Sequence, residues 1–454
     1  MARDTTNSTI ITHPDMLIEY FLDGEKIGGD LRIGTEHERF AFQRDNLKPV
    51  PYSGEKGIGQ LLKNLQKLLN WSPILDGENI IGLFDEETQA AMSLEPGGQV
   101  ELSGAPLRTI HELCEENARF FAALKEAARP LNIDFFNMGT TPLHSRSQME
   151  HMPKSRYEIM RNYMPQVGTM GLDMMHRTAT IQTNYDYTSE ADMRRKMQIA
   201  MRLQPIVTGL FAASPFLDGK VTGYYSTRSY IWRNTDPDRT GILPFVFSPN
   251  FSYEDYVQWA LDVPMYFVLR NGHYHSCTDI SFRQFLSGAL KGRIKDYQPN
   301  LGDWANHLST LFPEVRLKRY IEMRGADCGP KTHIAALAAL WTGLLYDNTA
   351  LDQAEALTKN WDYETVLSLY TNVAKEGLNL TFERGKLIDI AAEVVKIAHI
   401  GLNNRQNVQN FKDESYYLKP LEIIITSKTT VAEEMLFSYN SWWQKNMDFA
   451  FMES

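Results

Sequence analysis

Residues 32–42 read RIGTEHERFAF, and this stretch is typical of a β-strand. Its residues alternate as in a strand, so the side chains of Glu36 and Glu38 point to the same face, roughly 7 Å apart. Two carboxylates at that spacing, when partly buried, repel each other and resist ionisation unless a cation lies between them. A solvated edge strand would also accept them. The choice between an exposed edge and a cation site depends on the rest of the chain.

The composition is that of a folded protein with a large core. The chain has 454 residues, of which 43% are hydrophobic, 11% aromatic and 22% charged, and this length suits one large enzyme domain or several average ones. Acidic residues outnumber basic ones by 56 to 46, which gives a net charge of −10. This charge argues against a nucleic-acid binder, which needs a basic surface. A local group of arginines and metal ions can still bind a small anion.

Cysteine usage and apolar segments predict where the protein works. Three cysteines occur, at positions 114, 277 and 328, without a CxxC pair, so we expect no disulfide framework and a reducing compartment. The N-terminal residues lack the apolar core of a signal peptide, and no apolar run reaches the ~18 residues that span a bilayer. We therefore predict a cytoplasmic monomer or homodimer without membrane or nucleic-acid partners.

Helical and strand-like segments follow one another without a repeating βα unit. Strands are expected at 80–84, 93–104 and 133–140, with a tight turn at Pro96-Gly97-Gly98. Helices are expected after the capping patterns at Ser189 and Thr430, at 384–402, and at 57–71. The helix at 57–71 should bury one side, formed by Leu61, Leu62, Leu65, Leu68 and Leu69.

These elements predict an α+β fold with an antiparallel sheet. No low-complexity tract, repeat or long linker marks a clean domain boundary. We expect a single catalytic domain over residues 1–454, with a sheet-bearing core at about 16–345 and a mainly helical part at about 346–454.

Four strand-like segments each carry polar side chains on one face: TEHE (35–38), LEPGGQVEL (94–102), TATIQTNYDY (178–187) and RYIEMRGAD (319–327). Each by itself fits a half-exposed strand. Together they offer five carboxylates with amide, hydroxyl and guanidinium groups, and such oxygen ligands suit Mg²⁺ or Mn²⁺ on the phosphates of a nucleotide. The polar residues are Glu36, Glu38, Glu95, Glu101, Glu322, Thr178, Thr180, Gln182, Asn184 and Arg324.

Other motifs are weaker. The segment HYHSC (273–277) aligns two histidines and a cysteine on one strand face, but no fourth zinc ligand is evident. The glycines of GEKGIGQ (54–60) match neither GxGxxG nor GxxxxGK[ST]. Two basic segments, at 155–165 and 226–241, fit an anionic substrate because arginine pairs bidentately with carboxylate or phosphate. They supply Arg156, Arg161, Asn162, Arg228, Arg233 and Arg239.

Long blocks of the chain resemble the glutamate–cysteine ligases of the plant and proteobacterial type. The blocks include RIGTEHERFAF, SLEPGGQVELSGAPLRTIHE, MPKSRYEIMRNYMPQVGTMGLDMMHRTATIQTNYDY and FPEVRLKRYIEMRGAD, and the resemblance runs from about residue 16 to the C-terminus. It implies a glutamine-synthetase-like cradle, in which helices flank a curved antiparallel sheet. It also implies ATP-dependent ligation of the γ-carboxyl group of L-glutamate to L-cysteine, the first step of glutathione biosynthesis, with feedback by glutathione.

The resemblance carries roles onto particular residues. Mg²⁺, with Mn²⁺ as an alternative, would be bound by Glu36, Glu38, Glu95, Glu101 and Glu322. Glu36, Glu38 and Arg324 would be catalytic, and Gln182 and Arg324 would bind ATP. The substrates would contact Arg161, Asn162, Arg228, Asn184 and Thr180.

Two alternatives stay open: a carboxylate–amine ligase with another amine acceptor, and a non-catalytic sensor of amino acids or nucleotides. The complete set of carboxylates argues against the sensor. Plant relatives carry cysteine pairs, but Ala179 and Ala335 stand at the positions of one pair, and Cys277 has no partner near residue 292. We therefore expect no disulfide activation of the plant kind.

Overall fold

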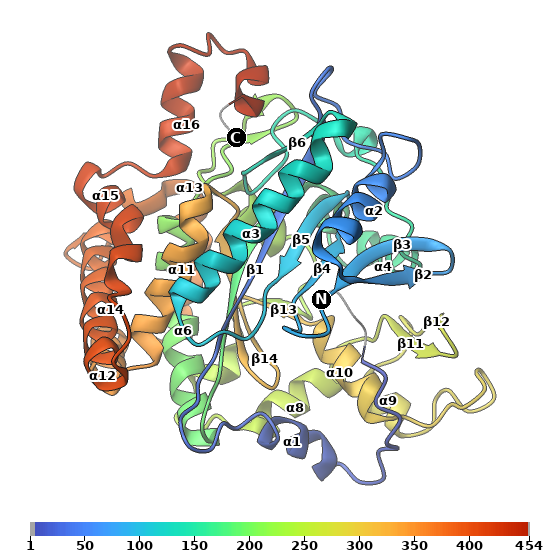
Figure 1. Ribbon diagram of the computed structural model, residues 1–454. Coiled ribbons are helices and arrows are strands. Elements are labelled where there is room, and N and C mark those ends of the chain that lie inside the picture. The colour runs from blue at the N-terminus through green and yellow to red at the C-terminus, as the bar shows by residue number, and fades with distance from the viewer. Residues whose placement is uncertain (1–4, 453–454) are drawn as a thin grey trace.

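The computed structural model describes residues 5–452, and an antiparallel sheet of nine strands lies at the centre of this part of the chain (Figure 1). The long strand β1, formed by RIGTEHERFAF and its neighbours, pairs with β5 on one side and with β7 and β6 on the other. The sheet order is β14 (Val315–Leu317), β15 (Ile321–Asp327), β7 (Thr180–Tyr185), β1 (Ile33–Gln43), β5 (Gln99–Ser103), β4 (Ala91–Leu94), β3 (Asn79–Phe84) and β2 (Ser72–Asp76), with β6 (Ile133–Phe136) beside β1.

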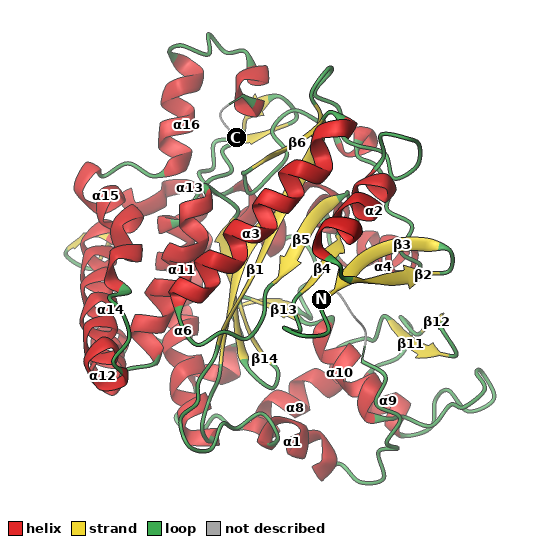
Figure 2. Ribbon diagram, in the orientation of Figure 1, coloured by secondary structure: helices red, strands yellow, loops and turns green. Residues whose placement is uncertain are grey.

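Helices lie on both faces of the curved sheet (Figure 2), as the sequence predicts. One face packs against the long helices α3 (Ile110–Ala128), α6 (Glu190–Leu210) and α11 (Lys331–Leu345). The opposite face borders a cavity that is completed by α4 (Arg156–Val167), α5 (Gly171–Arg177), α7 (Thr227–Arg233) and α10 (Leu301–Ser309). We call the two sides the helix-covered face and the cavity face.

The predicted helical C-terminal part is also confirmed. After α11, the described chain is helical except for short turns and a two-residue hairpin, β16 (Thr381–Phe382) and β17 (Gly385–Lys386), and it forms the orange-to-red side of Figure 1. Its helices are α12 (Asn348–Thr358), α13 (Tyr363–Glu376), α14 (Leu387–Gln409), α15 (Lys419–Ser427) and α16 (Val431–Asn440).

Smaller elements surround the sheet. The remaining helices are α1 (Asp15–Leu22), α2 (Ile58–Leu69), α8 (Tyr253–Asp262) and α9 (Phe282–Leu286). Short strand pairs join β8 (Phe216–Leu217) to β9 (Lys220–Val221), β10 (Thr240–Gly241) to β13 (Phe312–Pro313), and β11 (Phe267–Arg270) to β12 (His273–Ser276).

The capping signals fold as their chemistry requires. Ser189 accepts a hydrogen bond from the backbone N–H of Asp192 at 3.2 Å, and α6 begins at the next residue. Thr430 and Glu433 form a reciprocal capping box at the start of α16. These bonds satisfy backbone N–H groups that have no partner inside the helix.

Two local predictions need correction. Leu68 was expected on the buried side of the helix at 57–71, but it is 44% exposed, because the apolar stripe turns away from the core in the last turn of α2. The sequence predicts Thr178 within a strand, but it directly follows α5, where it forms an isolated bridge with Thr140, and β7 begins only at Thr180.

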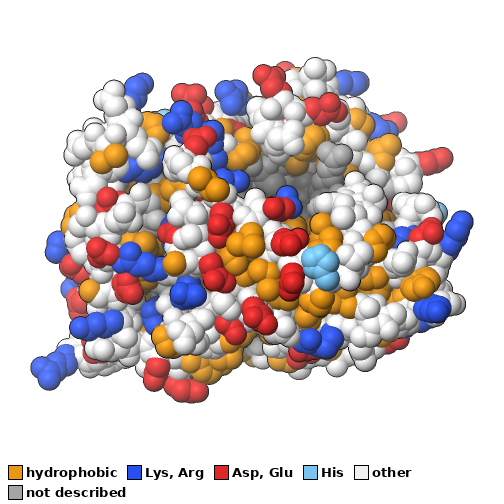
Figure 3. Space-filling model, turned by 90° about the horizontal axis from the view of Figure 1, so that it is seen from below, with side chains coloured by type: hydrophobic (Ala, Val, Ile, Leu, Met, Phe, Trp, Pro, Cys, Tyr) orange, Lys and Arg blue, Asp and Glu red, His pale blue; other side chains and the backbone are white. Residues whose placement is uncertain are grey.

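The surface carries both signs of charge. Figure 3 shows acidic and basic side chains interspersed over the end of the molecule that lies below in Figure 1. Within residues 5–452, no helix combines the length and the apolar character that crossing a bilayer requires.

Candidate active site

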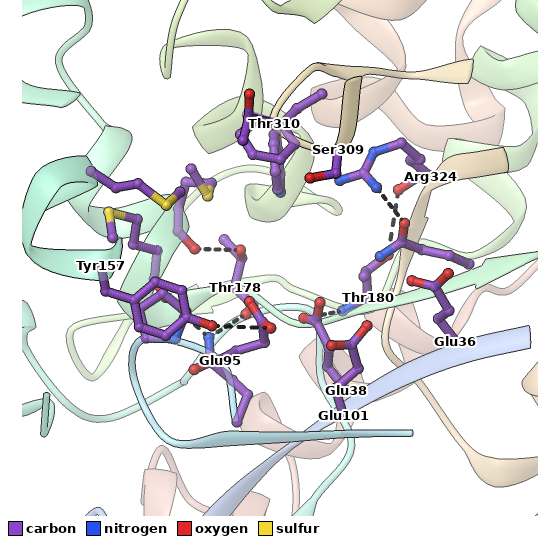
Figure 4. Close-up of a pocket in the computed structure, with 18 of the residues that line it drawn as sticks. Glu36, Glu38, Glu95, Glu101, Tyr157, Thr178, Thr180, Ser309, Thr310 and Arg324 are labelled. Atoms are coloured by element: carbon purple, nitrogen blue, oxygen red, sulfur yellow. Dashed lines mark hydrogen bonds between the residues drawn. The ribbon is translucent and has the colours of Figure 1, made fainter. Parts of the chain in front are cut away.

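Four of the five predicted carboxylates line the cavity on the cavity face of the sheet. Glu36 and Glu38 project from β1 into this space. Glu101 on β5 is the direct partner of Glu38 across the strand pair, and the two side chains lie next to each other in Figure 4. Glu95 enters from the turn between β4 and β5. The sheet thus gathers residues from distant parts of the sequence on one wall.

The turn that carries Glu95 is fixed by its glycines. Gly98 has a φ of +87°, a left-handed conformation that a side chain disfavours. Glu95 and Gln99 close the turn through a backbone hydrogen bond of 2.9 Å. Tyr157 of α4 donates hydrogen bonds from its hydroxyl group to the Leu94 carbonyl at 2.7 Å and to Glu95 Oε1 at 3.3 Å. The carboxylate therefore faces the cavity from a braced position.

The carboxylates repel one another. Burial, with Glu95 and Glu101 adding to it, raises the pKa of Glu38 well above its ordinary value. Burial also raises the pKa of Glu36, and the nearby charges of Glu322 and Glu101 add to the increase. Carboxyl groups in this state gain stability from a proton or from a bound cation. The wall is therefore suited to divalent cations, although among residues 5–452 no three His, Cys, Asp or Glu side chains form a preformed metal site.

Positive charge also lines the cavity. Four arginines from four elements contribute it: Arg156 of α4, Arg228 of α7, Arg316 of β14 and Arg324 of β15. The Arg228 guanidinium donates to the Arg324 carbonyl at 2.9 Å. The Trp232 and Phe312 rings lie 5.8 Å and 5.5 Å from the Arg324 guanidinium. The cavity thus combines an acidic wall, formed by the four carboxylates, with an arginine wall, formed by Arg228, Arg316 and Arg324.

Glu322 lies behind the arginine wall rather than in the cavity. It is fully buried, with Arg316 Nη2 at 2.7 Å and Lys318 Nζ at 2.9 Å, and it also pairs with Arg324. Burial alone would raise the pKa of Glu322, but Arg316, Lys318 and Arg324 outweigh it and hold the pKa well below the ordinary value. Three cations already surround this carboxylate, so its visible role is to position Arg316 and Arg324.

Residues of β7 form hydrogen bonds to the carboxylates and to Arg324. Thr180 donates its backbone N–H to Glu38 Oε2 at 3.1 Å, and Asn184 donates its side-chain amide to Glu36 Oε1 at 3.0 Å. Gln182 accepts a hydrogen bond from Arg324 Nη1 at 2.6 Å. Thr180 and Gln182 line the cavity, whereas Asn184 reaches it only through Glu36.

Arg161 and Asn162 are not brought to this cavity. On α4, Arg156, Tyr157 and Met160 face it, and the next residues turn away because each helical residue rotates the side chain by about 100°. Arg161 lines a second cavity that contains the stacked rings of His151 and His176, and Asn162 is exposed beside β12. The predicted contact of these two residues with substrate lacks support from their positions.

Tyr157 and Arg316 also line the cavity, although they are not among the site residues predicted from the sequence. Both lie in quoted blocks, and the pairing of Arg316 with Glu322 follows from the tight β14–β15 hairpin. A strand reversal at residues 318–320 would have placed them side by side. The same applies to Lys318, which contacts Glu322 from the turn.

Two solved structures illustrate the fold that this chain shares with other proteins. The glutamate–cysteine ligase from Francisella tularensis, solved in complex with AMP, superposes with a TM-score of 0.53 over 94% of this chain and 87% of that chain, at 14% identity. A bifunctional glutathione synthetase from Pasteurella multocida gives a TM-score of 0.51 and 14% identity over 98% of this chain and 54% of that chain. At such identities the likeness concerns the fold.

Proteins with a similar sequence show the family to which the chain belongs. The chain is 46% identical to a chloroplastic glutamate–cysteine ligase from Medicago truncatula over 99% of this chain and 87% of that protein. The Arabidopsis thaliana enzyme of the same name is 45% identical over 99% of this chain and 84% of its own length. The family described as Glutamate-cysteine ligase family 2 (GCS2) matches residues 32–451. The chain belongs to this family.

Proposed function

We propose that this chain joins the γ-carboxyl group of L-glutamate to the amino group of L-cysteine at the expense of ATP, giving γ-glutamylcysteine, ADP and phosphate. Membership of the glutamate–cysteine ligase family over nearly the whole chain supports this activity. The observation that carries the site assignment is the cavity that four carboxylates and four arginines line together. Such a cavity suits a reaction between anions, whose charges must be neutralised before they meet.

The reaction is proposed in two displacements. The γ-carboxylate of glutamate attacks the γ-phosphorus of ATP, the bond to the bridging oxygen breaks, and ADP leaves. The unprotonated cysteine amine then attacks the carbonyl carbon of γ-glutamyl phosphate and expels phosphate, which takes up the proton that the amine loses. Arg324 and Arg228 would spread the negative charge of the transferred phosphoryl group. Gln182 would hold Arg324 in position, and Thr180 would orient Glu38 through its backbone N–H.

We assign metal binding to Glu36, Glu38, Glu95 and Glu101, and not to Glu322. The raised pKa values of Glu36 and Glu38 support this choice, because a cation beside them would replace the proton that burial favours. The all-oxygen donor set suits Mg²⁺, with Mn²⁺ as the alternative. When bound, the metal would neutralise the ATP phosphates.

Several finer assignments belong to the same proposal. A cytoplasmic location rests on the cysteine usage of the sequence, while the relatives are chloroplastic enzymes. Feedback by glutathione, a monomeric or homodimeric state and the absence of nucleic-acid partners rest on the resemblance and on the charge balance. The cysteines at 114, 277 and 328 are free thiols, which agrees with a reducing compartment.

ADP release by the purified protein tests the function. It is measured with Mg²⁺, ATP and glutamate, with and without cysteine, beside a panel of other amines. Cysteine-dependent ADP formation, matched by γ-glutamylcysteine, is the expected result. A stronger response to another amine would replace the acceptor and keep the mechanism. Nucleotide binding without turnover for any amine would favour the sensor and overturn the proposal.

A further inference from the structure

The helix-covered face of β1 carries a buried cation without a hydrogen-bond partner. Arg39 follows Glu38, so its side chain points away from the active-site cavity. It is only 2% exposed, and within residues 5–452 its Nε, Nη1 and Nη2 atoms find no hydrogen-bond acceptor. Buried polar groups are almost always hydrogen-bonded, and a buried charge without a partner is costly. An arginine in this position therefore indicates a ligand.

Arg39 lines a further charged cavity, distinct from the active-site cavity and from the cavity of Arg161. The cavity lies between β1, β6, the C-terminal part of α3 and the start of α11. Five cationic side chains line it, against one carboxylate, Asp134, which is already paired with Arg44 at 2.6 Å. The cations are Arg39, Arg44, Lys125, Arg129 and Lys331. This concentration of positive charge occurs in a protein whose net charge is −10.

Arg39 is the buried member of this group, whereas Arg44, Lys125, Arg129 and Lys331 are exposed. Two of the five cations contact the same aromatic ring. The Phe121 ring of α3 has the Arg39 guanidinium at 4.5 Å and the Lys331 ammonium at 5.0 Å from its centroid. Burial lowers the pKa of Lys331, and the charges of Arg39 and Lys125 lower it further. Burial also lowers the pKa of Arg39. Like charges held together in this way are stabilised by an anion.

The backbone adds to the positive potential. Lys331 is the first residue of α11, a helix of 15 residues, and Pro330 before it provides no side-chain cap. The free N–H groups and the dipole of a helix N-terminus favour oxyanions. Arginine contributes a planar fork of donors, and lysine contributes a mobile point charge. Tetrahedral phosphate oxygens match this mixture of donors.

We propose that this cavity binds a small phosphorylated anion, at a site separate from the active site on the opposite face of the sheet. The buried Arg39 guanidinium would bind the phosphate from below, and Lys331 of α11 and Lys125 of α3 would bind it from two helices. The Phe121 ring packs against Arg39 and Lys331. The inference does not depend on the proposed reaction, because no residue of the cavity lines the active site.

Calorimetric titration with pyrophosphate in the presence of EDTA tests the proposal. Without metal, the carboxylate wall of the active site repels the probe, so binding is expected at the Arg39 cavity. Lys331→Gln should weaken binding about tenfold, since hydrogen bonds to charged groups contribute about that factor, and Arg39→Met should abolish it. Lys359→Gln, an exposed residue that follows α12, is the matched control and should bind as the parent protein does.

Further variants separate the two cavities. Arg228→Lys changes the active-site wall and should leave pyrophosphate binding unchanged. Loss of binding in this variant, together with normal binding by Lys331→Gln, would place the probe in the active site and overturn the proposal. Absence of binding to the parent protein, or a clear preference for citrate over pyrophosphate, would overturn it as well. If Arg39→Met fails to fold, Lys331→Gln alone decides.

Discussion

The two faces of β1 carry side chains of opposite charge, and on both faces burial disfavours the charged form. Toward the active-site cavity, Glu36 and Glu38 have raised pKa values because burial and neighbouring carboxylates oppose their ionisation. On the other face, burial lowers the pKa of Arg39. Neither group improves the stability of the unliganded fold. In the two proposals made above, one strand serves two ligand sites, since alternation places adjacent residues in separate environments.

A third kind of charge on the sheet is fully balanced. Glu322 is as deeply buried as Arg39, but it pairs with Arg316, Lys318 and Arg324, and its pKa is lowered. We therefore distinguish Glu36 and Glu38, which are proposed metal ligands, from Glu322, which positions Arg316 and Arg324.

The largest effect is expected from Glu322→Gln. The substitution leaves three buried cations without their common partner, and breaking a buried ion pair destabilises a protein by about 3–5 kcal/mol. Urea denaturation measures the free energy of unfolding, and Glu434→Gln, on the exposed side of α16, is the control. Unchanged stability with lost metal-dependent activity would return Glu322 to the metal ligands.

Glu36→Gln should instead reduce turnover without weakening the fold. Removal of a group from a preorganised electrostatic site lowers kcat by about 10²–10³-fold. The variant should unfold at the same urea concentration as the parent protein or a higher one, because one repelling charge is gone. Steady-state ADP release measures the first effect, and Glu87→Gln on the surface is the control. Retained activity would exclude Glu36 from the catalytic set.

A smaller effect concerns pH. The folded-state pKa of Glu38 lies above the ordinary value of 4.5, so between the two values the folded state binds more protons than the unfolded state. Stability therefore falls as pH rises through this window. Glu38→Gln lacks this loss, so its stability relative to the parent protein should increase as the pH rises above the ordinary pKa of the carboxyl group, measured in EDTA. A stability difference that does not change with pH would contradict the raised pKa.

The smallest effect is expected from Arg161→Ala. Since Arg161 lines the second cavity of α4 and not the active site, kcat/KM for ATP and glutamate should change by less than about twofold. Arg228→Ala provides the contrast and should raise the KM of an anionic substrate. A loss of tenfold or more in Arg161→Ala would restore its predicted contact with substrate.

Much of the fold and part of the site were predictable. The β4–β5 turn, the caps of α6 and α16 and the helical C-terminal part follow from local signals, because turn and cap chemistry acts over a few residues. The convergence of Glu36, Glu38, Glu95 and Glu101 was expected from the strand faces and the resemblance. The positions of Arg161 and Asn162 were not predictable, because their side-chain directions depend on how α4 packs.

The sequence by itself determined the family, the alternation of β1 and the residue types needed for binding anions and cations. Only the tertiary structure decided which charges remain unbalanced. Glu322 and Glu38 both stand on strand faces, yet the β14–β15 hairpin brings cations to one and the β1–β5 pairing brings carboxylates to the other. In the sequence, Arg39 is one polar residue among several in its strand, and its burial results from the packing of α3 and α11. The energy of a charge depends on what surrounds it at a few ångströms, and residues distant in sequence provide those surroundings.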